Sequence, residues 1–299
     1  MTTSPTVSVI IPAYNRAATI HRAIRTVLAQ TFADYELIVV DDASSDPTRE
    51  TVQKIPDGRV KLIVHEKNRG AAAARNSGMK AAAGKYIAWL DSDDEWLPLK
   101  LEAQLSALRK APGEVKACYC AYERVENDQS VVYIPRSKDA RSLYLTCDLG
   151  PGSTLLFERA VLDTVGFLDE TLTRYEDAEW LLRYCSRYRL IGVDEPLARV
   201  HDASRPSAEE VERAARAFIA RISPGLRSYG VFRRVAISRR WMDVASYFAL
   251  EHRPGRMLLY VCKALWVYPF QPAEAWAWLV NNWFEIKIGR WLFKWKRQV

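Results

Sequence analysis

Three carboxylates occur within four residues in the segment Asp91–Asp94, which reads DSDD and directly follows the strand-like run Lys85–Leu90. Carboxylates this close together repel one another unless a cation neutralises them, and carboxylate oxygens are ligands that suit Mg²⁺ or Mn²⁺. Magnesium is typically held by one or two carboxylates together with phosphates of a substrate. The alternative is that Asp94 caps a helix beginning near Leu97, which accounts for one aspartate and leaves two unexplained.

Further candidate residues end other strands or begin helical patterns. Asp42, at the end of an apolar run, can accept hydrogen bonds from a base or ribose, and Arg75 can make a bidentate contact with phosphate. Glu176 and Asp177 begin a helical pattern and could supply a general base for an acceptor hydroxyl. Each has a structural alternative: a capping aspartate, a solvated helix charge, or carboxylates stabilised by the helix dipole. His201 follows the last expected strand, where a lone histidine is more often structural than a ligand.

Alternating strand-like and helical patterns predict the elements that position these residues. Four buried strands are expected at Val7–Ile11, Glu36–Val40, Val60–Val64 and Lys85–Leu90. An alanine-rich helix over Ala71–Ala83, ended by Gly84, lies between the last two. This order implies an α/β fold with a mostly parallel sheet flanked by helices on both faces. Ligands in such sheets bind beyond the carboxyl ends of the strands, so Pro12–Arg16, Asp41–Asp46 and Asp91–Glu95 should share one edge.

The pattern continues less regularly as far as His201. Strands are expected at Val115–Ala121, Val131–Ile134, Pro151–Phe157 and Leu190–Val193, and helices at Leu97–Leu108, Glu158–Val165 and Glu176–Tyr188.

Composition bounds the class of protein. The chain has 299 residues, of which 49% are hydrophobic, enough to bury a sizeable core. The odd number of five cysteines, with no second pair at zinc-ligand spacing, indicates reduced thiols in a cytosolic compartment. The N-terminal segment lacks the basic region of a signal peptide, and no run of 18 uncharged apolar residues occurs. We therefore expect the catalytic part to face the cytosol.

The end of the chain differs in composition from the rest. Residues 231–299 carry 12 basic and 4 acidic residues and seven of the ten tryptophans. A helix over about 273–297 is expected to have one aromatic and one basic face, and such helices lie on anionic membrane surfaces. The alternative is that the tryptophans pack on the catalytic domain or on a partner chain. No nucleic-acid-binding motif accompanies the basic residues, so no nucleic-acid partner is expected.

A resemblance covers about residues 6–202. The segments VSVIIPAYNRAATIHRAIRTVLAQTFADYELIVVDDASSD, NRGAAAARNSGMKAAAGKYIAWLDSDDEW and GSTLLFERAVLDTVGFLDETLTRYEDAEWLLR, followed by RVH, resemble in order and spacing the inverting family 2 glycosyltransferases with a GT-A fold. The chain is similar to bacterial members with a C-terminal helical extension. The resemblance implies transfer of a sugar from a nucleotide-sugar donor, with Mg²⁺ or Mn²⁺ stabilising the leaving nucleoside diphosphate.

The resemblance also implies roles for residues on the donor side of the site. Pro12, Tyr14 and Arg16 would flank the nucleotide base. Asp42 would bind that base by hydrogen bonds. Arg75 would lie near the diphosphate of the donor.

The remaining implied roles concern the metal and the reaction. Asp91 would contact ribose or sugar and share a metal with Asp93, the second aspartate of the D-x-D motif. Asp177, beside Glu176, would be the catalytic base of a single in-line displacement that inverts the anomeric carbon. His201 would assist in binding metal or diphosphate.

These implications define the expected organisation: a GT-A catalytic domain over 1–205, a helical linker over 206–230 and a basic aromatic tail over 231–299. The donor expected from family frequency is a UDP-sugar, and the acceptor a lipid-linked sugar or a surface polysaccharide. We expect a peripheral protein on the cytosolic face of the cell membrane, with C-terminal helices that could also support an oligomer.

Two rival functions have distinguishable features. A sugar nucleotidyltransferase should carry a glycine-rich basic loop after the first strand, and here that loop reads PAYNRAAT, without glycine. A non-catalytic membrane-bound scaffold would bind the nucleotide sugar without turnover, and the intact pair Glu176-Asp177 argues against it.

Overall fold

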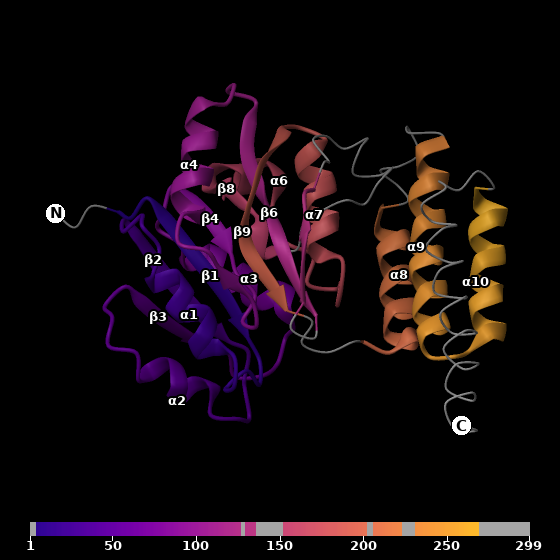
Figure 1. The fold of residues 1–299 in the computed structure, drawn as a ribbon, viewed down its shortest axis with the longest axis horizontal. Helices are drawn as coiled ribbons and strands as arrows, with labels where there is room; N and C mark the ends of the chain where they lie inside the picture. The colour runs from indigo at the N-terminus through magenta and orange to yellow at the C-terminus, as the bar shows by residue number, and fades with distance from the viewer. Residues whose placement is uncertain (1–3, 127–128, 136–151, 202–205, 223–230, 269–299) are drawn as a thin grey trace, which may run out of the picture. The chain divides into compact units, whose positions relative to one another are not determined.

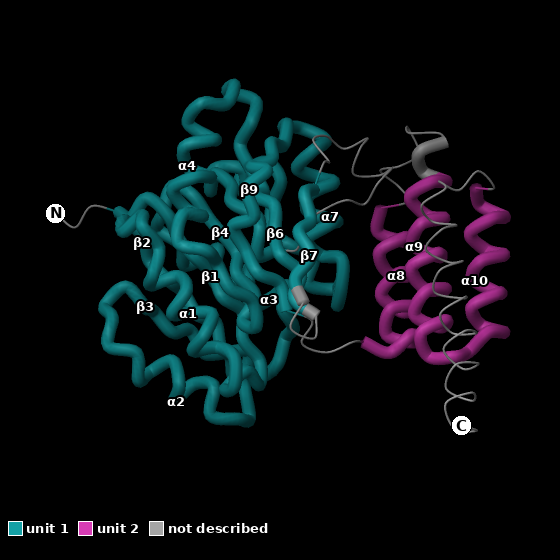
Figure 2. Tube along the Cα trace, viewed as in Figure 1, with its two compact units in different colours: residues 1–204 teal, residues 205–299 magenta. Residues whose placement is uncertain are grey.

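Alternation of strands and helices dominates the first two thirds of the chain in a computed structural model (Figure 1). The structure describes residues 4–126, 129–135, 152–201, 206–222 and 231–268. It divides into two units, residues 1–204 and 205–299 (Figure 2). The amphipathic helix expected over 273–297 lies outside the described residues.

Parallel strands form the first half of the sheet in the first unit. Their order is β3 (Val60–Val64), β2 (Tyr35–Asp41), β1 (Val7–Ala13) and β4 (Tyr86–Trp89). All residues of β1, β2 and β4 are buried, as expected for strands covered by helices on both faces. Because the strands are parallel, their carboxyl ends lie at one edge and bring the expected polar clusters together.

The second half of the sheet is mixed. Strand β8 (Leu156–Glu158) runs antiparallel to β4 and to β6 (Val115–Glu126), and β9 (Arg189–His201) runs parallel to β6. At the edges, β5 (Glu95–Trp96) pairs with β9 and β7 (Gln129–Tyr133) pairs with β6, both antiparallel. The mostly parallel arrangement expected from the sequence therefore describes the first four strands.

One segment begins differently from its prediction. Pro151–Phe157 was expected as a strand, but Gly152–Thr154 forms a 3₁₀ turn and β8 begins only at Leu156. The reason lies in the hydrogen bonds: the Ser153 hydroxyl accepts from the Asp91 backbone N–H at 3.0 Å, and other groups of the turn contact neighbouring side chains. This turn brings a serine to the carboxyl end of β4.

Helices cover both faces of the sheet (Figure 1). The α-helices that the structure describes in the first unit are α1 (Ile20–Leu28), α2 (Thr48–Gln53), α3 (Ala71–Ala81), α4 (Lys100–Lys110), α6 (Leu162–Val165) and α7 (Glu176–Cys185). Apolar residues of α1 and α4 share a core with Val7, Val9 and Ile11 of β1. The intervening Ile10 instead faces α3, where only a glycine, Gly78, leaves room for it.

An aromatic cluster attaches α7 to the sheet. Trp180 of α7 packs against Trp89 of β4 and Phe157 of β8, with ring centroids 5.6 and 4.7 Å apart. Its indole N–H donates to the Gly166 carbonyl at 2.8 Å. Because Trp180 is fully buried, these contacts set the position of the helix that begins with Glu176.

Close packing of two segments explains a glycine that the sequence suggested would end a helix. Helix α3 ends at Ala81, three residues before Gly84. A Cβ on Gly84 would lie 2.6 Å from the backbone nitrogen of Ser8, nearer than real Cβ contacts occur. Its N–H donates to the Ser8 hydroxyl, which in turn donates to Glu36 at 2.5 Å. Gly84 is therefore required for its contact with β1.

In the described part of the second unit, α8 (Ala208–Ile222) and α10 (Pro254–Val267) both pack against α9 (Val231–Leu250). Phe248 of α9 stacks on Tyr260 of α10 at 5.5 Å. The segment expected as a linker thus contains α8, which packs within this unit. None of the helices in the described ranges combines the length and apolar composition that crossing a membrane requires.

We predict that Gly84→Ala destabilises the protein by about 1–3 kcal/mol, because the added methyl group must displace the backbone of β1. Denaturant unfolding followed by circular dichroism measures the change. Gly113→Ala is the matched control, since a Cβ there meets no atom within 4 Å, and its effect should stay below about 1 kcal/mol. Equal stability of the two variants would contradict the assigned role of Gly84.

Candidate active site

A cavity of about 450 Å³ lies beyond the carboxyl ends of β1, β2 and β4, a size typical of small-molecule sites. Seven residues that the sequence singled out line it: Pro12, Tyr14, Arg16, Asp42, Arg75, Asp91 and Asp93. The other three, Glu176, Asp177 and His201, are not part of its lining. The structure therefore brings together, in one cavity, the seven residues that were expected to bind the nucleotide-sugar donor and its metal.

The loops after β1 and β2 join at one wall of the cavity. Asn15 accepts a hydrogen bond from the Ser45 N–H at 2.8 Å, and its own N–H donates to the Ser44 hydroxyl at 2.9 Å. Asn15 and Ala43 have left-handed backbone conformations, with φ of 52° and 62°. Such conformations cost energy for residues other than glycine and persist where surrounding contacts hold them.

Asp42 is buried and holds the loop that leads into α3. Its carboxylate accepts from the His65 ring at 2.6 Å, from the Arg69 N–H at 3.0 Å and from the Gly70 N–H at 2.7 Å. Gly70 has a φ of 89°, which favours glycine. These contacts occupy both carboxylate oxygens, a structural role that sequence reasoning missed. Base binding by Asp42 stays a prediction.

Arg75 connects the cavity with the beginning of α7. One guanidinium nitrogen donates to Asp91 at 2.5 Å and another to Glu176 at 2.6 Å. Burial would lower the pKa of Arg75, but the carboxylates of Asp91 and Glu176 raise it above its ordinary value. The side chain is 6% exposed, so the alternative that Arg75 is a solvated helix charge is wrong. Its diphosphate contact stays a prediction.

The D-x-D segment is held at both ends by hydrogen bonds. The Ser153 hydroxyl accepts from the Asp91 N–H and donates to Asp94 at 2.5 Å. The other oxygen of Asp94 accepts from the His201 backbone N–H at 3.0 Å. Helix α4 begins only at Lys100, so the alternative that Asp94 caps this helix is wrong. Ser153 is a positioning residue that sequence reasoning missed, because its partners lie about 60 residues earlier in the chain.

Asp93 has the carboxylate of this segment that is least engaged by the protein. Its nearest charged partner is Arg16, at 3.7 Å. Burial and then the Asp91 carboxylate raise the pKa of Asp93, against the opposing effect of Arg16. A divalent cation between Asp93 and Asp91 would relieve this repulsion.

The described residues contain no group of three or more His, Cys, Asp or Glu side chains that could hold a metal by themselves. Magnesium sites on nucleotides commonly use only one or two carboxylates, with phosphates and water completing the shell. Asp93 and Asp91 fit a cation of that kind.

Glu176 and Asp177 begin α7 beyond the lining of the cavity. The preceding Tyr175 has a left-handed φ of 63°. Glu176 binds Arg75 and so contacts the cavity through it. Burial and the neighbouring Glu176 raise the pKa of Asp177 to about 6, although Arg75 opposes them. A carboxylate with this pKa can accept a proton near neutral pH.

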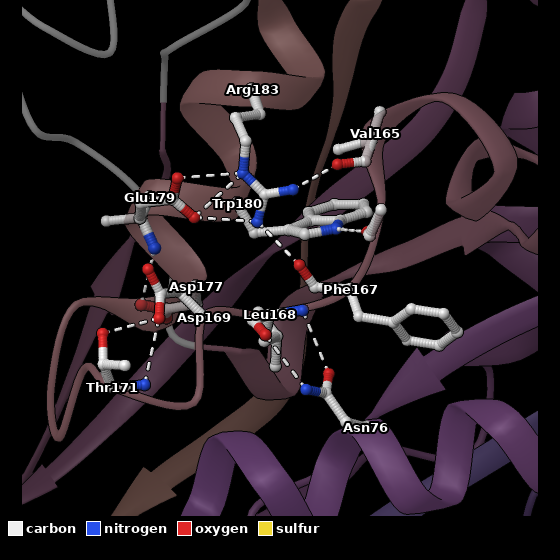
Figure 3. A network of polar contacts seen from close by, with 12 residues as sticks. Asn76, Val165, Phe167, Leu168, Asp169, Thr171, Asp177, Glu179, Trp180 and Arg183 are labelled. Carbon is white, nitrogen blue, oxygen red and sulfur yellow. Dashed lines mark hydrogen bonds and ion pairs between the residues drawn. The ribbon is translucent and has the colours of Figure 1, made fainter. Parts of the chain in front are cut away.

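A polar network fixes the loop before α7 (Figure 3). The Arg183 guanidinium donates to Glu179 on its own helix and to the carbonyls of Val165 and Phe167. Asn76 of α3 exchanges two hydrogen bonds with the backbone of Leu168, both at 3.0 Å. Sequence reasoning missed this role of Arg183, because its partners are backbone carbonyls some 16 to 18 residues away.

His201 does not face the cavity. Its ring Nε2 contacts Glu95 at 2.7 Å, and its backbone N–H holds Asp94. Both contacts join β9 to the segment that follows the D-x-D motif. The structure therefore gives His201 a positioning role behind the carboxylates, while a metal or diphosphate role stays a prediction.

We predict that Arg75→Met lowers the free energy of unfolding by about 3–5 kcal/mol, because it leaves the buried Glu176 and the partly exposed Asp91 without their counter-ion. Chemical denaturation measures the loss. Arg69→Met is the control: it removes an ion pair with Glu170 whose side chains are 41% and 35% exposed, and such pairs contribute at most about 1 kcal/mol. A small loss in Arg75→Met would show that its ion pairs are not essential to the fold.

Comparison with known proteins identifies the family. The sequence profile described as "Glycosyl transferase family 2" matches residues 8–166, more than half of the chain. The Escherichia coli protein WfgD, a UDP-Glc:alpha-D-GlcNAc-diphosphoundecaprenol beta-1,3-glucosyltransferase, is 40% identical over 163 residues. That match covers 54% of this chain and 63% of WfgD, so the chain spans less than two thirds of this relative.

Solved structures share the fold. S. aureus TarS 1–349 in complex with UDP superimposes with a TM-score of 0.65 at 19% identity, covering 95% of this chain and 92% of that one. The mannosyltransferase PcManGT from Pyrobaculum calidifontis, in complex with GDP-Man and Mn²⁺, has a TM-score of 0.62 at 21% identity and covers 95% and 87%. These similarities confirm the predicted fold class. With the family profile, they lead to one conclusion: this chain belongs to glycosyl transferase family 2.

Proposed function

We propose that the protein transfers a sugar from a nucleotide-sugar donor to an acceptor hydroxyl in a metal-dependent reaction that inverts the anomeric carbon. The observation that carries this proposal is the double contact of Arg75, at 2.5 Å from Asp91 of the cavity and 2.6 Å from Glu176 beside Asp177. It joins the donor cavity and the candidate base into one electrostatic unit.

On the donor side, Asp93 and Asp91 would hold Mg²⁺ or Mn²⁺, which supplies charge stabilisation to the departing diphosphate. Arg16 faces Asp93 from the loop after β1 and, with Pro12 and Tyr14, would flank the base. The binding of UDP by TarS and of GDP-Man and Mn²⁺ by PcManGT supports a donor and a cation of this kind.

On the acceptor side, Asp177 would take the proton of the attacking hydroxyl. The hydroxyl oxygen forms a bond to the anomeric carbon while the bond from that carbon to the diphosphate oxygen breaks, and the leaving group keeps the electron pair. Attack from the face opposite the leaving group inverts the configuration. The pKa of about 6 for Asp177 leaves the carboxylate ionised near pH 7, as a general base requires.

The substrate classes follow from WfgD, whose name gives UDP-glucose as donor and a sugar on a lipid diphosphate as acceptor. We therefore propose a UDP-sugar donor and a lipid-diphosphate-linked acceptor in polysaccharide biosynthesis. Contact with an anionic membrane surface would bring the protein to such a lipid. The exposed apolar residues of α10 support this contact: Leu258, Leu259 and Trp266 are 59%, 45% and 91% exposed.

We predict that Asp93→Asn weakens Mn²⁺-dependent binding of UDP on the order of 10- to 100-fold, the range seen when support of a metal site is lost, and abolishes sugar transfer. Titration calorimetry with UDP, with and without Mn²⁺, measures the first effect. The exposed Asp163 provides the control variant Asp163→Asn. Unchanged binding in Asp93→Asn would remove this residue from the metal site.

We predict that Asp177→Asn lowers kcat about 10²–10⁴-fold, the usual contribution of a general base, with little change in UDP affinity. In the unaltered protein, kcat/KM should rise with pH through about 6, because Asp177 must lose its proton before it can accept another. The assay follows release of nucleoside diphosphate, and a nucleotidyltransferase would release pyrophosphate instead. Turnover close to normal in Asp177→Asn would assign the proton transfer to another group.

A further inference from the structure

Three arginines line the cavity, and they differ in their partners. Arg16 lies 3.7 Å from Asp93, and Arg75 is bound by two carboxylates. Arg174 makes no ion pair or hydrogen bond within the described ranges, and its Nε is buried without a partner. Burial of a guanidinium donor without an acceptor is costly. A ligand that supplies acceptors inside the cavity would remove this cost.

The local backbone explains how Arg174 comes to line the cavity. Tyr175 adopts a left-handed conformation, with φ of 63° and ψ of 16°, between Arg174 and the first residue of α7. This left-handed residue turns the backbone between the loop that carries Arg174 and helix α7. Contacts of Arg183 with the Phe167 carbonyl and of Asn76 with Leu168 hold the earlier part of the same loop. These hydrogen bonds therefore hold the loop that carries Arg174.

The charges around the cavity indicate the chemistry of its ligand. Both oxygens of Asp42 are bonded within the protein, and Asp91 shares the guanidinium of Arg75 with Glu176. Arg174 therefore contributes a positive charge that no carboxylate among the described residues neutralises. Guanidinium groups present paired N–H donors that match phosphate oxygens, often in a bidentate geometry.

We infer that Arg174 binds the diphosphate group of a ligand in this cavity. The inference rests on the proposed function, which it extends by naming a residue that would contact the charge developing on the leaving group. Donors placed where negative charge develops stabilise a transition state more than a ground state. A loss of Arg174 should therefore affect both ligand affinity and turnover.

Two ligands of the proposed reaction carry a diphosphate, namely the UDP-sugar donor and the lipid-linked acceptor. Their contributions can be separated because binding of UDP can be measured in the absence of acceptor. Uridine provides a further probe, since it keeps the base and ribose and lacks the phosphates.

The experiment compares Arg174→Gln, Arg174→Lys and the control Arg187→Gln, whose arginine is exposed in the turn that follows α7. Calorimetry measures binding of UDP with Mn²⁺ and binding of uridine, and steady-state assays measure KM for donor and acceptor. We expect Arg174→Gln to weaken UDP binding on the order of 10- to 100-fold, as for loss of a charged hydrogen bond, with uridine binding unchanged. Arg174→Lys should retain part of the affinity, and Arg187→Gln all of it.

The alternative outcomes are distinct. A rise in acceptor KM alone, with UDP binding unchanged, would support diphosphate binding and assign it to the acceptor. Equal loss of UDP and uridine binding with a lowered Tm would overturn the inference, because it indicates a purely structural role. Unchanged binding and kinetics would overturn it as well, while leaving the proposed function intact. Failure of the unaltered protein to bind UDP or transfer sugar would instead refute the proposed function.

Discussion

The buried guanidinium of Arg75 is the interaction on which the rest of the site depends. Asp91 lies just after β4, whereas Glu176 begins α7, and it follows Arg75 by 101 residues in the sequence. Without a cation between them, two carboxylates in a poorly solvated space would repel each other and separate these elements. The aromatic contact between Trp89 and Trp180 brings the same two elements together by apolar packing. Charge and packing thus favour one arrangement of helix and sheet.

Local backbone strain is concentrated around this arrangement. Of the four non-glycine residues with positive φ in the described parts of the chain, Asn15, Ala43 and Tyr175 belong to the loops that surround the cavity. Each such conformation costs on the order of 1–3 kcal/mol and persists only where other contacts over-determine it. Hydrogen bonds between Asn15 and Ser45 supply such contacts at one wall. The loops that carry the polar residues therefore keep their shape at a cost to the stability of the fold.

Much of this architecture could be predicted from the sequence, because β1, β2 and β4 are buried on both faces and read as continuous apolar runs followed by polar residues. The expectation that Val60–Val64 is also fully buried was wrong, since β3 is the edge strand and its residues are only partly covered. The cavity residues at the strand ends, such as Asp91 and Asp93, followed from the same logic. The bridging role of Arg75, the hold of His201 on Asp94 and the turn at Ser153 could not. They depend on contacts between residues about 60 to 107 positions apart, which periodicity and spacing do not encode. The short strand Glu95–Trp96 likewise depends on its pairing with β9, which lies about 100 residues later in the sequence.

The support of the D-x-D segment has a consequence for ligand selection. Ser153 and His201 hold its two ends, and the pairing of Glu95–Trp96 with β9 holds the chain immediately after it. This side of the cavity is consequently preorganised and has little freedom to adapt to the shape of what enters. Ligands that place a cation or a hydrogen-bond donor against Asp91 and Asp93 therefore meet a fixed geometry, which favours those that match it without rearrangement.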